Sequence, residues 1–382
     1  MTRDVLTADV IVIGGGIAGA SLAARLAGKA RVLLLEMEAQ AGYHATGRSA
    51  ANFEPTYGPP VIRALTRASG AFFRDPPEGF AAVPLLSPRG VLMLGVADDG
   101  ALAEAYIGLG YRACGFAEAK RRYPLLREGV AAHHLIDDTT TDVDVEALHR
   151  GFLAQHRRAG GALLCKAAVT HGERRGGIWH VQTGAGECQA PVIVNAAGAW
   201  ADGVAKACGV VALGLTPKRR SACIVAEPPG VDLRAWPQVG NLKETFYAKP
   251  MGGKLMISPS DAVPSEPHDA FADDMALAEA IDQYQQVFDH EVTRIESSWG
   301  GLRTFAPDGN PVIGFDAAAQ GFFWCAGQGG YGIQTAPALG AVAAALLQHK
   351  PVPDEIANFG VTAAELAPAR FAPGQPTPDR GR

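Results

Sequence analysis

The stretch Val10-Ile-Val-Ile-Gly-Gly-Gly-Ile-Ala-Gly19 decides the fold. Its first part, Val10–Ile13, is a short continuous apolar run, which is typical of a parallel strand buried on both faces. The glycines follow at the spacing G-x-G-x-x-G, and the small residues after Gly19 favour a helix. Arg31–Glu36 is a second apolar run that ends in an acid. Together these segments predict a βαβ unit with a glycine turn before its helix.

Each glycine of this turn has its own role in the predicted nucleotide site. Gly14 permits the tight turn, Gly16 lets a pyrophosphate approach the backbone, and Gly19 lets the helix pack closely on the strand. The helix N-terminus offers unpaired N–H groups and the positive end of a dipole to the phosphates. Glu36 follows Gly14 by about 20 residues, where an acid binds a ribose 2′-OH. The unit therefore predicts a dinucleotide site.

Two further small-residue turns favour FAD over a nicotinamide cofactor. Asn195–Gly198 and Gly327–Gly332 each follow a predicted strand, and the second opens a helix. The dipole of that helix would stabilise negative charge on a reduced flavin ring. A nicotinamide enzyme needs only the first unit and a nearby substrate. The alternative interpretation of both turns is close packing in an α/β core rich in alanine and glycine.

Length, composition and charge limit the function classes. The chain has 382 residues, enough for two domains of about 100–200 residues each. Hydrophobic residues make up 48% and charged residues 19%, which fits a globular protein with a large core. The net charge of −5 offers no basic field, so we expect no nucleic acid partner.

Cysteine spacing and the length of apolar runs bear on metals and location. The cysteines show no CxxC or other metal-ligand spacing, so we predict no metal site and a reducing compartment. The apolar run near the N-terminus is too short for a signal peptide. Thr335–Leu347 is too short to span a bilayer, which needs about 20 apolar residues. We expect a cytoplasmic protein without a transmembrane segment, and peripheral contact with a membrane stays open.

Several different motifs are distributed along most of the chain, from about Val10 to beyond Gln334. They are Gly14–Gly19, Glu36, Gly42–Ala51, Asn195–Trp200, Pro217–Arg220, Gly301–Arg303 and Gln328–Gln334. Together they resemble the D-amino acid oxidase/glycine oxidase superfamily, and within it the bacterial FAD-dependent D-arginine dehydrogenases. No single motif is specific, but the combination is.

The resemblance implies an α/β fold with a Rossmann-like FAD-binding domain and an inserted α+β domain whose mixed β-sheet binds the substrate. We expect the FAD-binding domain in residues 1–85, 142–212 and 300–366, and the substrate-binding domain in residues 86–141 and 213–299. Residues 367–382 are rich in proline, arginine and glycine, and are predicted to form a disordered tail.

The resemblance also implies FAD held without a covalent bond. Some flavoenzymes link FAD through histidine, but for His44 a packing or hydrogen-bonding role is the stronger interpretation. Sarcosine oxidases carry their linking cysteine near the segment that here is Leu302–Phe305, which has none. The expected cofactor-binding residues are Gly14, Gly16, Ile17, Ala18, Gly19, Glu36, His44, Thr46, Arg48, Ser49, Ala50, Val169, Ala197, Gly198, Trp200, Gly329, Tyr331, Gly332, Ile333 and Gln334.

The resemblance implies oxidative deamination of a D-amino acid. The Cα hydride passes to flavin N5, and the imino acid hydrolyses to a 2-keto acid and ammonia. Arg220 and Arg303 would bind the substrate carboxylate, a role that suits the two-pronged guanidinium. Tyr57 and Tyr247 would close over the substrate. The backbone carbonyl of Gly330 would accept a hydrogen bond from the amine.

Departures from the family pattern leave the side-chain preference open. Asn52 stands where the family places a histidine, and Glu54 where a small hydroxyl residue is expected. Val91 replaces the acid that pairs with a substrate guanidinium, and losing such charge-assisted bonds costs about 1.5–3 kcal/mol. Two hypotheses follow. The preference has moved to apolar D-amino acids, or Glu54 has taken over the cation.

Other functions compete with this prediction. One is an amine oxidase of the same superfamily acting on glycine, sarcosine or D-proline, and another is a non-enzymatic dinucleotide-binding protein, which would not need the paired arginines. The electron acceptor of a dehydrogenase would be a quinone or an electron-transfer protein. The sequence leaves open the preferred D-amino acid, oxidase against dehydrogenase chemistry, and the oligomeric state.

Overall fold

The computed structural model describes residues 5–228 and 230–371, and the βαβ unit lies near the start of the first range. Its strands β2 (Val10–Ile13) and β3 (Val32–Leu35) are fully buried and parallel, and the helix α1 (Ile17–Arg25) joins them. Gly14 begins the turn at a φ of 111°, a backbone conformation that L side chains rarely adopt. The predicted strand, glycine turn and helix are therefore present in that order.

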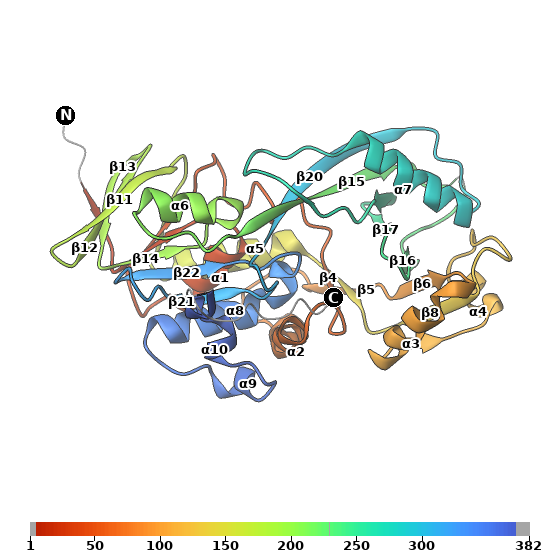
Figure 1. The fold of residues 1–382 in the computed structure, drawn as a ribbon, viewed down its shortest axis with the longest axis horizontal. Helices are drawn as coiled ribbons and strands as arrows, with labels where there is room; N and C mark the ends of the chain where they lie inside the picture. The colour runs from red at the N-terminus through yellow and green to blue at the C-terminus, as the bar shows by residue number, and fades with distance from the viewer. Residues whose placement is uncertain (1–4, 229, 372–382) are drawn as a thin grey trace.

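The sheet that contains this unit joins distant parts of the chain (Figure 1). Its neighbours run parallel except at β21, which is antiparallel to β22. The carboxyl ends of its parallel strands meet at one edge, where nucleotides bind in open α/β sheets. In order across the sheet, the strands are β10 (Ala162–Leu164), β3, β2, β14 (Val192–Asn195), β22 (Phe322–Ala326) and β21 (Val312–Phe315).

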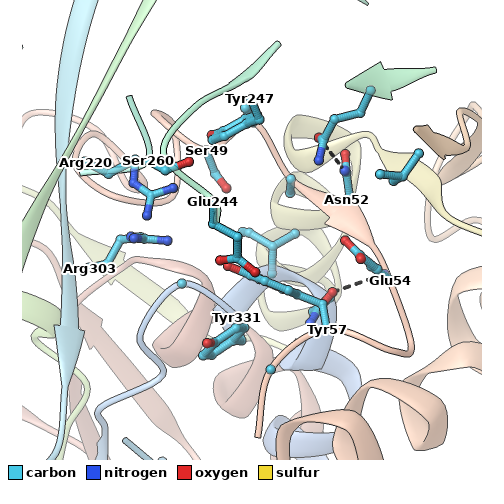
Figure 2. A pocket seen from close by; sticks show the side chains of 18 of the residues that line it. Ser49, Asn52, Glu54, Tyr57, Arg220, Glu244, Tyr247, Ser260, Arg303 and Tyr331 are labelled. Atoms are coloured by element: carbon cyan, nitrogen blue, oxygen red, sulfur yellow. Dashed lines mark hydrogen bonds between the residues drawn. The ribbon is translucent and has the colours of Figure 1, made fainter. Parts of the chain in front are cut away.

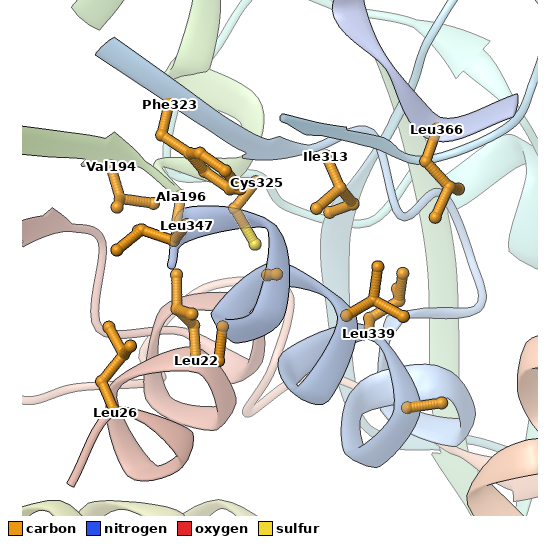
Figure 3. Packing of buried hydrophobic residues seen from close by; sticks show 14 of the residues in the cluster. Leu22, Leu26, Val194, Ala196, Ile313, Phe323, Cys325, Leu339, Leu347 and Leu366 are labelled. Atoms are coloured by element: carbon orange, nitrogen blue, oxygen red, sulfur yellow. The ribbon is translucent and has the colours of Figure 1, made fainter. Parts of the chain in front are cut away.

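Helices bury one face of this sheet and close an apolar core (Figure 3). Leu22 of α1 and Leu339 of α8 (Gly332–Leu347) lie in one cluster with Phe323 of β22. Each fully buried side chain of this kind stabilises the fold by about 1.5–3 kcal/mol. A Cβ at Gly340 would lie 3.0 Å from Ser21, so glycine lets α8 approach α1 closely. The helices α2 (Pro60–Arg74) and α5 (Val145–Arg158) pack beside them.

A larger, mixed sheet forms the other half of the molecule (Figure 1). Its long strands β15 and β20 each have one end near the first sheet in Figure 1, and only β16 and β6 pair in parallel. Three helices lie beside this sheet: α3 (Gly100–Gly108), α4 (Phe116–Arg122) and α7 (Asp274–Val287) (Figure 1). Its strands are β19 (Val263–Pro264), β15 (Thr216–Val225), β18 (Lys254–Ser258), β17 (Tyr247–Met251), β16 (Gln238–Asn241), β6 (Val91–Gly95), β8 (His133–Asp137) and β7 (Arg112–Ala113), with β20 (Ile295–Phe305) on β15.

Two smaller sheets complete the described residues. One lies between the two larger sheets and consists of β4 (Asn52–Phe53), β9 (Thr141–Val143) and β5 (Leu86–Pro88) (Figure 1). The other consists of β1 (Leu6–Thr7), β13 (Gly186–Ala190), β12 (Ile178–Thr183) and β11 (Val169–Arg175). The remaining helical segments are α6 (Ala201–Ala207), α9 (Asp354–Ala357), α10 (Ala363–Leu366), and the short 3₁₀ turns Ala97–Asp99, Gly198–Trp200 and Pro368–Phe371.

The C-terminal prediction needs a correction. Residues 367–371 were expected to be disordered, but Pro368–Phe371 forms a 3₁₀ turn. Arg370 holds it in place, because its guanidinium bonds the Asp308 carboxylate at 2.7 Å and the carbonyl of Asn310 at 2.9 Å. The rest of the predicted tail, 372–382, lies outside the described residues, and the domain boundaries stay a prediction. Among the described helices, none has the length and apolar character needed to cross a bilayer.

Candidate functional site

A cavity of about 290 Å³ lies at the carboxyl edge of the parallel sheet. The glycine turn, the flavin loop around residues 42–48 and the turn after β14 surround it. Half of the expected cofactor residues line this cavity: Gly14, Gly16, Glu36, His44, Thr46, Arg48, Val169, Ala197, Gly198 and Trp200.

Side chains from outside the glycine turn hold its backbone. Glu36 accepts a hydrogen bond from the N–H of Gly15 at 3.0 Å, and Thr46 accepts one from the N–H of Ile17, also at 3.0 Å. The second bond occupies a free donor at the start of α1, as a capping side chain does. His149 of α5 donates from Nε2 to the carbonyl of Gly15 at 2.8 Å, and burial lowers the pKa of His149.

The shape of the turn fits a pyrophosphate. A Cβ at Gly14 would lie 2.3 Å from the carbonyl oxygen of Ala196, so nothing larger than glycine fits between the two turns. The N-terminal end of α1 opens into the cavity at Gly16, where the helix dipole favours phosphate. Glu36 lies at the same cavity, as an acid that binds a ribose must. These residues fit the nucleotide part of FAD.

Some expected cofactor residues lie behind the cavity walls. Gly19 packs on the turn, since a Cβ there would lie 2.0 Å from the carbonyl of Gly14. Gly332, at the start of α8, packs near Ile17, and Gly329 donates its N–H to the carbonyl of Thr304. These residues shape the walls through backbone packing. The expected cofactor residues absent from both cavity linings are Ile17, Ala18, Gly19, Gly329 and Gly332.

Two flavin-loop residues have protein partners. Arg48 donates to the carbonyls of Ala270 and Gly300 at 2.7 and 2.9 Å, and it pairs with Asp269. It therefore ties the loop to the segment before α7. His44 bonds Glu38 at 2.9 Å, and its ring packs on Trp200 at a centroid distance of 4.5 Å.

A second cavity of about 780 Å³ continues from the first, and Ala45, Arg48 and Gly301 line both. An elongated ligand such as FAD can therefore extend from one cavity into the other. All residues expected to bind substrate line the larger cavity, together with five more of the expected cofactor residues: Ser49, Ala50, Asn52, Glu54, Tyr57, Val91, Arg220, Tyr247, Arg303, Gly330, Tyr331, Ile333 and Gln334.

Two arginines share one side of this cavity (Figure 2). Arg220 of β15 bonds the carbonyl of Asp261 at 2.7 Å and lies 3.8 Å from its carboxylate. The guanidinium of Arg303, on β20, has neither a hydrogen bond nor an ion pair with any residue of 5–228 or 230–371, and its Nε is buried. Burial and, less strongly, the charge of Arg220 lower the pKa of Arg303. Leaving such a partly buried cation unpaired costs free energy, which an anionic ligand would reduce.

Tyrosines surround the arginines. Tyr57 packs on Tyr331 at a centroid distance of 5.3 Å, and the Arg220 guanidinium lies 6.0 Å from the Tyr247 ring. Burial raises the pKa of Tyr57, so its hydroxyl stays protonated and can donate. A Cβ at Gly330 would lie 2.5 Å from the Arg303 guanidinium, which keeps the backbone there close to the arginine.

Two carboxyl groups and two further tyrosines line the same cavity, and Glu54 lies on the side away from the arginines (Figure 2). Glu54 is buried, and Tyr111 donates to it at 2.6 Å. Burial raises the pKa of Glu54 to about 7, while the Tyr111 hydrogen bond opposes that rise. Tyr106 donates to Glu244 at 2.8 Å, and Glu244 also lines the cavity. Sequence reasoning missed Tyr106, Tyr111 and Glu244, because no motif marks them.

Asn52 belongs to a buried polar network that sequence reasoning also missed. The Nζ of Lys249 lies 2.7 Å from the Oδ1 of Asn52 and 2.6 Å from Asp142. Arg89 pairs with the other oxygen of Asp142, and Asn52 donates to the Oε1 of Gln238 at 2.8 Å. The one available signal was a lysine inside the otherwise apolar strand β17.

The fold and these cavities together define a flavin-dependent oxidoreductase. Residues 9–346 match the family described as FAD dependent oxidoreductase (DAO), and the chain belongs to this family. It is related to the glycine oxidase of Geobacillus kaustophilus, with 26% identity across 93% of this chain and 96% of that protein.

Further comparisons agree with the family and the fold. FAD-dependent oxidoreductase domain-containing protein 1 of Bos taurus is 24% identical over 89% of this chain and 81% of its own length. The crystal structure of the Geobacillus kaustophilus glycine oxidase superposes with a TM-score of 0.79, at 22% identity over 94% of this chain and 99% of that one. The L-amino acid deaminase of Proteus vulgaris gives a TM-score of 0.80 at 16% identity, over 97% and 99% of the two chains.

Proposed function

We propose that this FAD-dependent oxidoreductase deaminates an amino acid, with a D-amino acid as the first candidate, to a 2-keto acid and ammonia. The observation that carries the proposal is Arg303, whose partly buried guanidinium has no hydrogen-bond or ion-pair partner among the described residues and shares its cavity with Arg220. A substrate carboxylate would pair with the charge of Arg303 and accept further hydrogen bonds from Arg220. The same pair argues against a non-enzymatic dinucleotide-binding protein, which has no use for it.

The proposed roles of the chain are binding, orientation and exclusion of water. Arg303 and Arg220 hold the carboxylate, and the carbonyl of Gly330 accepts a hydrogen bond from the amine. Tyr57 and Tyr247 cover the substrate with their rings. FAD, when bound, supplies the acceptor for the hydride that leaves Cα. The amine loses a proton as the C=N bond forms, and water then adds to this imine and releases ammonia.

Different observations favour two classes of substrate within the family. A volume of about 780 Å³ accommodates an amino acid with a long side chain as well as the flavin ring. Relatedness to glycine oxidase favours the second candidate, an amine oxidase acting on glycine, sarcosine or D-proline. For a D-arginine-type preference we propose Glu54 as the partner of the cation, because Val91 offers no charge, and Glu244 is a second carboxylate in the same cavity.

Anaerobic reduction of the bound flavin tests this proposal. The holoenzyme is mixed with D-amino acids, their L-enantiomers, glycine, sarcosine and D-proline, and the visible flavin absorbance is followed. We expect bleaching by D-amino acids and at least a tenfold loss of kcat/KM in Arg303→Met, since charge-assisted hydrogen bonds contribute about 1.5–3 kcal/mol. Bleaching by glycine or sarcosine alone would favour the second candidate. No bleaching by any amine would overturn the proposal.

The same assay addresses two finer predictions. High D-arginine efficiency that Glu54→Gln leaves unchanged would refute the role of Glu54 as the cation partner. Reoxidation of the reduced enzyme by oxygen, compared with a quinone or an electron-transfer protein, would distinguish an oxidase from a dehydrogenase. The cytoplasmic location, the non-covalent attachment of FAD and peripheral membrane contact stay predictions, and acid precipitation that releases the flavin would establish the second of these.

A further inference from the structure

A charged side chain is buried behind the wall of the substrate cavity. Lys249 is only 4% exposed, and its Nζ lies between Asp142 at 2.6 Å and the Oδ1 of Asn52 at 2.7 Å. Arg89 bonds the other carboxylate oxygen of Asp142 at 2.6 Å. One carboxylate therefore serves two cations. Lys249 needs a further acceptor, and the side-chain oxygen of Asn52 provides it.

This contact sets the direction of the next hydrogen bonds. A lysine nitrogen in such a contact donates, so the atom of Asn52 that faces Lys249 must be its carbonyl oxygen. The amide nitrogen of Asn52 then points to Gln238, where it donates to Oε1 at 2.8 Å (the dashed line at Asn52 in Figure 2). Gln238 has its Oε1 occupied in this way, so the N–H groups of its Nε2 remain.

The N–H groups of Gln238 Nε2 are available to a ligand in the cavity. Gln238 lines it, and Nε2 of Gln238 has no protein partner within residues 5–228 and 230–371. It is also not among the buried unpartnered atoms of these residues, so a ligand can reach it. Val91 lies opposite Gln238 in the β6–β16 pairing and adds an apolar surface beside the amide. This end of the cavity therefore offers a hydrogen-bond donor next to an apolar wall.

We propose that Lys249 is a positioning residue that fixes, through Asn52, the hydrogen-bond polarity of Gln238, so that the enzyme selects an amino acid whose side chain ends in a hydrogen-bond acceptor. The inference rests on the proposed function, because the arginine pair must hold the carboxylate while the side chain reaches Gln238. A carbonyl or ester oxygen satisfies the amide. An ammonium group on the ligand would place its N–H donors opposite the N–H donors of Gln238, which is unfavourable because neither set finds an acceptor there.

Carboxylates without an amino group on Cα test the polarity separately from turnover. Monomethyl glutarate ends in an acceptor, heptanoate has the same chain length and is apolar, and δ-aminovalerate ends in a donor. Each is titrated into the FAD-loaded enzyme, and the shift of the flavin spectrum gives its dissociation constant. We expect the ester to bind about tenfold more tightly than heptanoate, and the amine to bind most weakly.

Two variants are expected to reverse this order by different routes. In Asn52→Asp the carboxylate accepts from both Lys249 and Gln238, so Gln238 turns its oxygen to the cavity and the amine becomes the best ligand. In Lys249→Met the amide of Asn52 is released to turn toward Asp142, its partner across β4–β9, with the same result. Lys249→Arg should keep the wild-type order, and Gln238→Leu should abolish the difference between ester and heptanoate.

These measurements distinguish a failure of the polarity inference from a failure of the proposed function. Equal weakening of all three ligands in Asn52→Asp and Lys249→Met would mean a purely structural role for the network and would overturn the inference. A wild-type preference for the amine or for heptanoate, or no binding of any of the three, would overturn it too. The expected order of affinities without bleaching by any amino acid would support the polarity of the pocket and refute the proposed function alone. If Asn52→Asp fails to retain FAD, Gln238→Leu, whose side chain lies at the cavity surface, carries the test.

Discussion

The hydroxyl of Tyr111 lies 2.6 Å from Oε1 of Glu54, inside the cavity that we assign to the substrate. Burial raises the pKa of Glu54 from 4.5 to about 7, and the hydrogen bond from Tyr111 limits the rise. A protonated Glu54 has an O–H donor in addition to the oxygen that Tyr111 occupies. The charge at this end of the cavity therefore changes near neutral pH.

Glu54→Gln should change how stability depends on pH. The unfolded carboxyl loses its proton near pH 4.5, whereas the folded one keeps it to about 7, so wild-type stability falls as pH rises through this window. The amide does not ionise and avoids the penalty, which amounts to about 3 kcal/mol at most. The Tm difference between variant and wild-type holoenzyme should therefore grow between about pH 5 and pH 8. The same difference at both pH values would contradict the assignment.

Tyr111→Phe is the matched control for this prediction. It removes the one contact that lowers the pKa of Glu54 and leaves the carboxyl in place. The window in which stability falls should then extend to higher pH, since the folded state would keep its proton longer. A shift of that window to lower pH would show that Tyr111 does not stabilise the ionised form.

Arg303→Met should separate substrate binding from stability. The Arg303 guanidinium has no hydrogen-bond or ion-pair partner within residues 5–228 and 230–371, so removing it costs the fold little and Tm should stay equal or rise. Affinity for a substrate carboxylate should fall at least tenfold, because the charge-assisted hydrogen bonds are lost. Arg370→Met gives the opposite pattern, since Asp308 would be buried without its partner at a cost of about 3–5 kcal/mol. Equal destabilisation by both variants would argue that Arg303 is a structural residue.

The sequence predicted features that depend on local patterns. The turn from Gly14 to Gly19 follows from glycine spacing and short apolar runs, which the fold preserves. Arg220 and Arg303 are far apart in the chain, and only the family resemblance suggested that they act together; β15 and β20 pair in the structure and bring both to one cavity. Their roles in substrate binding stay a prediction.

Features that depend on contacts between distant segments could not be predicted. The Lys249 network joins β4, β9 and β17, and a lysine within an apolar strand gives no indication of its partners. The contact between Tyr111 and Glu54 could not be predicted either, because no motif marks the segment that contains Tyr111. Composition suggested disorder from residue 367 onward, but the ion pair of Arg370 with Asp308 orders the first part of that tail.

Thr46→Val should weaken FAD binding through α1. The hydroxyl of Thr46 accepts from the N–H of Ile17 at 3.0 Å, and valine keeps the shape while losing this acceptor. Loss of a helix cap costs about 1 kcal/mol, which corresponds to roughly a fivefold higher dissociation constant for FAD. Thr46→Ser keeps the acceptor and should bind like the wild type. Titration of the apoprotein with FAD measures both, and unchanged affinity in the valine variant would refute the role of the cap.

His149→Phe should release FAD by loosening the glycine turn. His149 donates to the carbonyl of Gly15 at 2.8 Å, and its ring leaves no room for a side chain at Gly42, where a Cβ would lie 2.8 Å away. One histidine thus holds both the glycine turn and the flavin loop. Loss of a hydrogen bond that leaves a buried carbonyl unpaired costs about 1–3 kcal/mol, so we expect the dissociation constant of FAD to rise about tenfold.

His156→Phe is the matched control, because His156 lies on the same helix, is buried as well, and bonds the carbonyl of Ala162 at 3.1 Å, a residue of β10 that lines neither cavity. It should lose stability without losing affinity for FAD. Burial lowers the pKa of both histidines, so the neutral form of His149 that donates from Nε2 persists below its usual range. The protonated ring also donates from Nε2, so wild-type FAD affinity should hold as pH falls through about 6.5. Equal loss of FAD in both variants would show that helix stability, and not the contact with Gly15, retains the cofactor.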